Sequence, residues 1–178
     1  MEILKKAIST VSKTMSEKRS EKNMKVMTNF VAEAKKSPAV KKLWDSNFIL
    51  PVQSKISSPF GAMRFVNNKV VGYHSGIDFP VPVGTPLKAS NSGKVVLAKE
   101  LTSTGNTLVI DHGMNVFSSY AHMSVLNVKE GDTVKKGDII GKSGNTGFTT
   151  GPHLHFTISV GTTFVNPYLF IDSPVLEK

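Results

Sequence analysis

The sequence predicts a mainly β protein, in which a small basic helical segment precedes an antiparallel sheet or sandwich. Apolar residues recur at helical spacing in the first third of the 178-residue chain. From about residue 49 onward this spacing stops, and glycine and proline become frequent. Short runs of β-branched and aromatic residues then follow one another about every ten residues with turns between them, as in antiparallel β folds. We therefore expect a helical segment over residues 1–47 and a β domain over residues 48–178.

The first third has the pattern of amphipathic helices. One apolar stripe is formed by Leu4, Ile8, Val11 and Met15, and a second by Met24, Met27, Phe30 (or Val31) and Ala34. Ser37 and Pro38 suit the cap and the first residue of a further short helix. These patterns predict two or three helices, which Trp44 and Phe48 would anchor to the β domain.

The charge is positive and concentrated near the N-terminus. The formal net charge is +9, and residues 1–50 hold 11 of the 22 Lys and Arg but 5 of the 13 acidic residues. Such an excess favours an anionic partner: nucleic acid, a membrane surface or a cell-wall polymer. No base-stacking aromatic pattern accompanies the lysines, so we expect no nucleic-acid partner. A solvated helical face packed on the domain is the simpler interpretation, and docking to a partner or onto the chain itself is the alternative.

The composition limits the chemistry and the route of delivery. The chain has no cysteine, so a zinc site must use histidine and carboxylate ligands. No apolar run is long enough to span a bilayer. Lys5, Lys6 and Lys13 interrupt the start of the chain, so we expect no signal peptide there. A protein that acts outside the cytoplasm would then be delivered by a phage or virion, or represent a truncated secreted enzyme.

The β domain contains five clear candidate strands. They cover Gly93 to Ala98, Thr107 to Ile110, Asn115 to Ala121, Asp138 to Lys142, and Leu154 to Val160. The last follows the turn Gly151-Pro152 and carries two histidines, His153 and His155, two positions apart. Residues two apart on a strand point to the same face, about 6.6 Å from each other. If one of the two binds a metal, the other therefore stands beside the ion.

A second histidine segment contains His74 and Asp78, four positions apart. In a straight strand these residues would lie about 13 Å apart, whereas two ligands of one zinc ion have donor atoms about 3–4 Å apart. They can share an ion only if the chain bends between them, and Gly76 permits such a bend. Together with one histidine of the His-x-His pair they would supply three protein ligands and leave a position for water, the pattern of a catalytic zinc site.

The two remaining histidines have different contexts. His122 follows a predicted strand in Tyr120-Ala121-His122-Met123, and is either a structural histidine or a member of the same pocket. His112, in the tight turn Asp111-His112-Gly113, is interpreted as a surface turn residue.

Residues 57–169 resemble the lysostaphin/LytM-type zinc endopeptidases, which cut peptidoglycan cross-links. Several motifs match in order and spacing: Ser58-Pro59-Phe60-Gly61, His74-Ser75-Gly76-Ile77-Asp78, Gly84-Thr85-Pro86-Leu87, Tyr120-Ala121-His122-Met123, Gly144-Asn145-Thr146-Gly147, Gly151-Pro152-His153-Leu154-His155-Phe156 and Asn166-Pro167. The resemblance implies the duplicated hybrid motif fold. It also implies that Zn²⁺ is held by His74, Asp78 and His155, and that His122 and His153 are the catalytic residues.

The resemblance predicts a zinc-dependent endopeptidase that hydrolyses peptide cross-links of bacterial peptidoglycan at the cell wall, in the periplasm or outside the cell, with a phage endolysin as one possibility. No Glu stands in a His-Glu-x-x-His motif, so the pair His122 and His153 would supply the proton acceptor and stabilise the oxyanion. The alternative is a non-catalytic wall-binding or structural module on the same fold, in a virion tail or a regulator. That alternative predicts lost ligands, whereas all five positions are intact.

Overall fold

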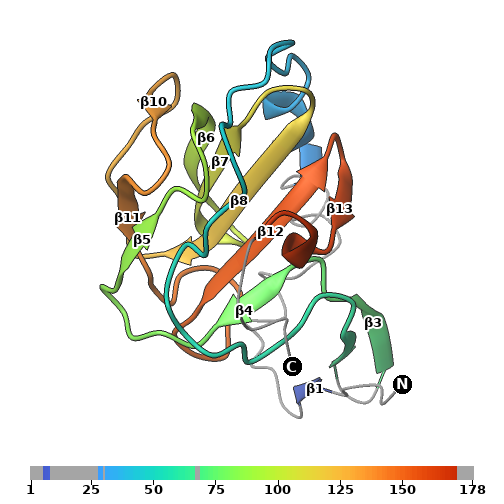
Figure 1. Cartoon of the computed structure of the whole chain (residues 1–178). Coiled ribbons are helices and arrows are strands. Elements are labelled where there is room, and N and C mark those ends of the chain that lie inside the picture. The colour runs from blue at the N-terminus through green and yellow to red at the C-terminus, as the bar shows by residue number, and fades with distance from the viewer. Residues whose placement is uncertain (1–5, 9–27, 30, 67–68, 172–178) are drawn as a thin grey trace.

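The computed structural model describes residues 6–8, 28–29, 31–66 and 69–171, and these residues form a mainly β fold as predicted (Figure 1). The strands are β1 (Lys6–Ile8), β2 (Met63–Val66), β3 (Lys69–Tyr73), β4 (Ile77–Phe79), β5 (Pro86–Lys88), β6 (Gly93–Leu101), β7 (Gly105–Asp111), β8 (Val116–Met123), β9 (Val125–Leu126), β10 (Thr133–Val134), β11 (Ile139–Lys142), β12 (Leu154–Val160) and β13 (Thr163–Val165). A short 3-10 helix, η1 (Pro167–Leu169), follows β13. All five strands expected from the sequence are present.

The largest sheet has seven antiparallel strands. Its order is β10-β6-β7-β8-β12-β13, and β4 also pairs with β12 beyond the end of β13. Strand β12 is therefore flanked by β8 on one side and by β4 and β13 on the other. Two smaller three-stranded sheets have the orders β1-β2-β3 and β5-β11-β9.

The two faces of the large sheet differ in what covers them. On one face Leu108, Tyr120 and Phe156 are fully buried in a core cluster that also includes Leu87 of β5 and Ile140 of β11. Alternate residues point to the other face, where Val109 and Phe117 form a smaller cluster with Leu97 and Leu101. Val31 and Ala34 of the N-terminal segment pack on this second cluster.

The N-terminal segment differs in part from the expected helices. Residues 28–29 and 31–34 are helical, but Lys6–Ile8 form β1, which pairs in parallel with β2. The remaining stripe positions Leu4, Val11, Met15, Met24, Met27 and Phe30 lie outside the described residues. Phe48 is buried in the core and Trp44 packs against it. The division of the chain at residue 47 stays a prediction. No helix in the described part of the chain is long and apolar enough to cross a membrane.

The short helix expected after Ser37 and Pro38 is absent from the described residues 37–46, which is a correction to the sequence interpretation. The backbone of this segment bonds to the sheet instead of to itself. Ala39 N–H donates to the Asp111 carboxylate at 2.7 Å, and Leu43 N–H donates to the His112 carbonyl at 2.8 Å. These long-range hydrogen bonds replace the ones that a helix would have made.

His112 is also unlike its expected surface position, because it is fully buried. Its ring packs against Phe48 with centroids 4.8 Å apart. Nδ1 lies 2.8 Å from the Ser92 carbonyl, which can only accept, so this nitrogen carries the proton. Nε2 lies 2.8 Å from Ser118 Oγ. Burial lowers the pKa of His112 from 6.5 to about 4, and the Ser92 hydrogen bond only partly opposes this. The residue is a neutral structural histidine.

This burial makes the fold sensitive to mild acid. Between pH 6.5 and about 4 the unfolded His112 is protonated while the folded one is neutral, so stability falls as the pH falls through this window. The shift corresponds to about 3 kcal/mol of unfolding free energy. Urea unfolding of the wild type and of His112→Gln at pH 7 and pH 4, both in a chelator, measures this contribution. We expect the variant to lose less stability than the wild type over this range, and equal losses would contradict the assignment.

Candidate metal centre

The central position of β12 determines which residues meet at the site. His155 lies opposite Ala121 of β8 on one side and opposite Asp78 of β4 on the other. His153 directly precedes β12, where it forms a bridge with Gly144. One strand therefore brings both histidines of the His-x-His pair to neighbours from two distant parts of the chain.

The bend expected between His74 and Asp78 is present. His74 lies in the break after β3, and Asp78 is the middle residue of β4. Gly76 sits between them, and a Cβ at this position would collide with the Phe156 carbonyl oxygen and the Thr157 side chain. The chain can therefore approach β12 this closely only with glycine at position 76.

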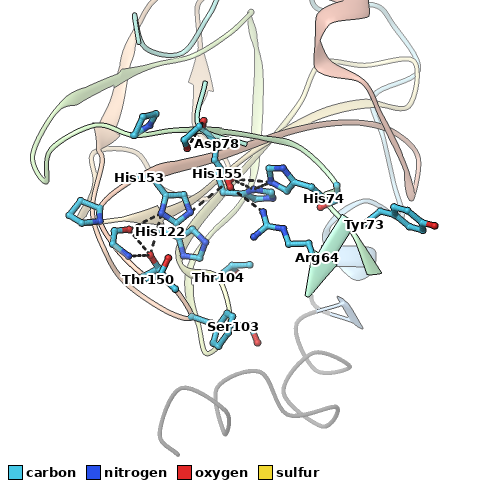
Figure 2. Close-up of a pocket in the computed structure, with 17 residues that line it drawn as sticks. Arg64, Tyr73, His74, Asp78, Ser103, Thr104, His122, Thr150, His153 and His155 are labelled. Carbon is cyan, nitrogen blue, oxygen red and sulfur yellow. Dashed lines mark hydrogen bonds and ion pairs between the residues drawn. The ribbon is translucent and has the colours of Figure 1, made fainter. Parts of the chain in front are cut away.

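The bend brings three donor atoms together. His74 Nε2 lies 3.0 Å from Asp78 Oδ1 and 3.0 Å from His155 Nδ1, and His155 Nδ1 lies 2.8 Å from Asp78 Oδ1. His74 and Asp78 are each 2% exposed, so these atoms meet in a largely water-free position. Figure 2 shows the three side chains converging beneath the Asp78 label, with His122 and His153 to one side.

The chemistry of this donor set fits a zinc ion. His74 Nδ1 lies 2.9 Å from the Pro59 carbonyl, which can only accept, so in neutral His74 the Nε2 atom presents a lone pair. That lone pair faces the Asp78 carboxylate. His74 Nε2 and Asp78 Oδ1 are then two hydrogen-bond acceptors 3.0 Å apart, and because acceptors repel each other, this arrangement requires a positive charge between them or beside them. Two imidazole nitrogens and one carboxylate oxygen are ligands that Zn²⁺ takes at about 2.0–2.2 Å. The hydrogen bond from His74 to a backbone carbonyl also orients a metal-ligating imidazole.

Arg64 contacts the other oxygen of Asp78. Its Nη2 lies 3.1 Å from Oδ2, so one carboxylate oxygen faces the two histidines and the other faces the guanidinium. Burial would raise the pKa of Asp78, but the neighbouring His155 and His74 side chains outweigh this effect and hold the pKa well below its usual range. Asp78 is therefore an ionised ligand, and Arg64 fixes which of its oxygens is presented. Reasoning from the sequence missed Arg64, because a lone arginine on β2 belongs to none of the histidine motifs.

Removing the Arg64 guanidinium should weaken metal binding without abolishing it. Loss of such an outer contact to a ligand typically costs ten- to a hundredfold in metal affinity. We expect this loss in zinc affinity for Arg64→Met, measured by competition with a chromophoric chelator. Lys88→Met, which removes an exposed positive charge on β5 instead, is the matched control. Unchanged affinity in Arg64→Met would show that Asp78 holds its position unaided.

His122 and His153 form a second pair beside the three donors. Their ring centroids are 4.7 Å apart, and His153 Nε2 lies 3.9 Å from Asp78 Oδ1. In each ring Nδ1 lies 2.8 Å from a backbone carbonyl, that of Thr146 for His122 and that of Gly151 for His153. In each neutral ring the proton therefore lies on Nδ1, and the lone pair on Nε2 is free to accept a proton. Burial, followed by the neighbouring His153, lowers the pKa of His122 from 6.5 to about 3.

All five predicted site residues line one open groove with a volume of about 410 Å³. Its walls come from the loop at residues 148–153 and from the segment around Tyr73 and Arg64 (Figure 2). Tyr73 is 70% exposed at this rim, an unusual position for a large aromatic side chain. The groove is open to solvent, so the five residues are accessible from outside the protein.

Comparison with protein families gives a match over the same region. Residues 72–167, which include all five site residues, match peptidase family M23. The peptidoglycan DD-endopeptidase ShyA of Vibrio cholerae is 44% identical over 119 residues, which make up 65% of this chain and 28% of that protein. The chain thus spans less than a third of the length of this relative.

Solved structures show the same fold. A zinc-containing peptidase from Vibrio cholerae matches with a TM-score of 0.65 and 35% identity, over 70% of this chain and 40% of that one. The catalytic domain of lysostaphin from Staphylococcus simulans matches with a TM-score of 0.61 and 38% identity, over 67% of this chain and 93% of that domain. The second match shows that the β portion of the present chain corresponds to nearly the whole of a catalytic domain.

Proposed function

The chain belongs to peptidase family M23, and from this premise we propose that it is a zinc-dependent endopeptidase that hydrolyses peptide cross-links of bacterial peptidoglycan. The observation that carries the proposal is the arrangement of five side chains in one groove. Three donor atoms lie within 3.0 Å of one another, and two further histidines stand beside them. His74, Asp78 and His155 would hold the zinc ion, and His122 and His153 would transfer protons.

The chemistry of hydrolysis divides between the ion and the protein. Bound zinc supplies a Lewis acid that polarises the scissile carbonyl and lowers the pKa of water. His122 and His153 present Nε2 towards the groove, because their Nδ1 atoms are bound to backbone carbonyls. One imidazole accepts the proton of the attacking water at Nε2. The imidazolium so formed donates a hydrogen bond to the developing oxyanion and then passes this proton to the leaving amine.

The openness of the groove and the positive charge of the chain support a polymeric substrate at the cell wall, in the periplasm or outside the cell. An open groove accepts a chain that continues at both ends, unlike a closed pocket. The net charge of +9 favours encounter with an anionic wall. Docking through the basic N-terminal segment belongs to this proposal as well. A non-catalytic module on the same fold would not need all five side chains.

Digestion of defined peptidoglycans tests the proposal directly. Zinc-loaded protein should release muropeptides with new amino groups, and mass spectrometry then identifies the bond as a D-Ala–diaminopimelate cross-link or a glycine bridge. Addition of a chelator should stop the release, and stoichiometric zinc should restore it. A zinc-loaded protein that releases no muropeptide from either kind of wall would refute the enzymatic function and leave the binding or structural module.

A further inference from the structure

A second cavity, of about 280 Å³, lies between the N-terminal helical residues and the large sheet. Thr28, Val31 and Ala32 form one wall, and strands β7, β8 and β12 form the other. His155, Ser75 and Thr104 line both this cavity and the metal groove. The cavity therefore continues the groove along β12, beneath a segment that lies outside the matched family region.

The floor of this cavity carries hydroxyl groups. Thr157 is two residues beyond His155 and on the same face, opposite Ser119 of β8. Thr157 is 3% exposed, and its Oγ1 makes no hydrogen bond to any described residue. Thr107 and Thr162 also line the cavity. The site is thus largely apolar with a few hydroxyl groups in its floor, as small-molecule sites commonly are.

Lys35 lines the same cavity and is 6% exposed. Its Nζ donates to Ser159 Oγ at 2.6 Å and lies 3.4 Å from the Gly161 carbonyl. It also lies 5.1 Å from the Phe117 ring centroid and 5.5 Å from that of Phe164. No acidic side chain within the described part of the chain forms an ion pair with it. Burial lowers the pKa of Lys35 to about 8, the expected effect on an ammonium that lacks a carboxylate partner.

We propose that this cavity is a second binding site, in which Lys35 receives a carboxylate of the peptide whose scissile bond lies at the metal centre. A buried cation costs stability unless it is paired, and an anionic ligand supplies the missing charge. Lys35 bonds to Ser159, which is four residues beyond His155 on β12, so the carboxylate lies about 13 Å from the metal centre. That distance corresponds to about four residues of extended peptide. The inference rests on the proposed function for the identity of the peptide.

Binding of two uncross-linked stem peptides tests the site without requiring turnover. One peptide carries its free carboxylates, and in the other they are converted to carboxamides. Calorimetric titration of zinc-loaded wild type should show tighter binding of the carboxylate form by about ten- to a hundredfold, as for a hydrogen bond to a charged group. Lys35→Met should lose most of this preference, whereas Lys35→Arg should keep part of it.

Two controls isolate the effect of Lys35. Lys36→Met removes the neighbouring charge, which is exposed and paired with Glu33, and should leave the preference unchanged. Lys35→Met should retain zinc and unfold at a temperature no lower than the wild type, because it removes a buried charge. A wild type that binds both peptides equally, or a Lys35→Met variant with the full preference, would overturn the inference. Absence of cleavage with an intact preference would instead refute the proposed function alone.

Discussion

Replacing His155 with alanine is expected to abolish both zinc binding and hydrolysis. The side chain supplies one of three donor atoms, and its loss leaves His74 Nε2 and Asp78 Oδ1 as the ligands that the described residues bring to the centre. Two donors do not complete the three-ligand set that catalytic zinc sites use. Zinc content should fall from about one ion per chain to below a tenth, measured by mass spectrometry on dialysed protein.

Val160→Ala is the matched control for this variant. Val160 ends the same strand, is 43% exposed, and lies outside the groove, so this change should leave zinc content and hydrolysis as in the wild type. Circular dichroism of both variants checks that the sheet remains folded. A His155→Ala protein that is folded and still holds one zinc ion would remove this residue from the ligand set.

His153→Ala should separate chemistry from metal binding. His153 lies beside the donors, with Nε2 3.9 Å from Asp78 Oδ1, but it is not one of the three converging ligands. The variant should therefore keep its zinc while kcat falls by about 10²–10⁴-fold, the usual contribution of a general acid or base. The assay is release of soluble muropeptides under single-turnover conditions, with zinc content measured on the same sample.

His122 offers an internal comparison for the same prediction. Because the two rings lie 4.7 Å apart and act on one proton-transfer step, the double variant should lose little more activity than either single variant. If the fold-loss of activity in the double variant equalled the product of the two single-variant losses, the two imidazoles would act in separate steps. A His153→Ala protein that dissolves cell wall at the wild-type rate would exclude the proposed mechanism.

The sequence predicted the elements whose signals are local. Strand β12 was predicted with its observed bounds, Leu154–Val160, because β-formers follow a clear turn. The arithmetic of strand spacing showed that His74 and Asp78 can share an ion only if the chain bends between them, and the bend is present at Gly76. Strand β4 was not predicted, since it has only three residues and is buried throughout, so it shows no alternation of polar and apolar positions.

The predictions that were wrong or incomplete concern residues whose contacts are with distant parts of the chain. Ser37 and Pro38 favour a helix start, but hydrogen bonds to Asp111 and His112 hold this segment in an irregular form. His112 stands in a turn sequence, yet Leu43 bonds to its carbonyl and Phe48 packs against its buried ring. Arg64 reaches Asp78 across 14 positions from outside every motif. Only the folded chain shows which distant groups meet, so these residues could not be placed from sequence alone.

The pairing of β4 with β12 also has a consequence for synthesis of the protein. His74 and Asp78 leave the ribosome long before His155, because 81 positions separate His74 from His155. The two early residues cannot form the complete centre in a nascent chain, and β12 can pair with β4 only after nearly the whole domain has been translated. The complete set of three donor atoms therefore cannot assemble in a partly made chain, and the proposed zinc site arises only when almost the whole domain is available to fold.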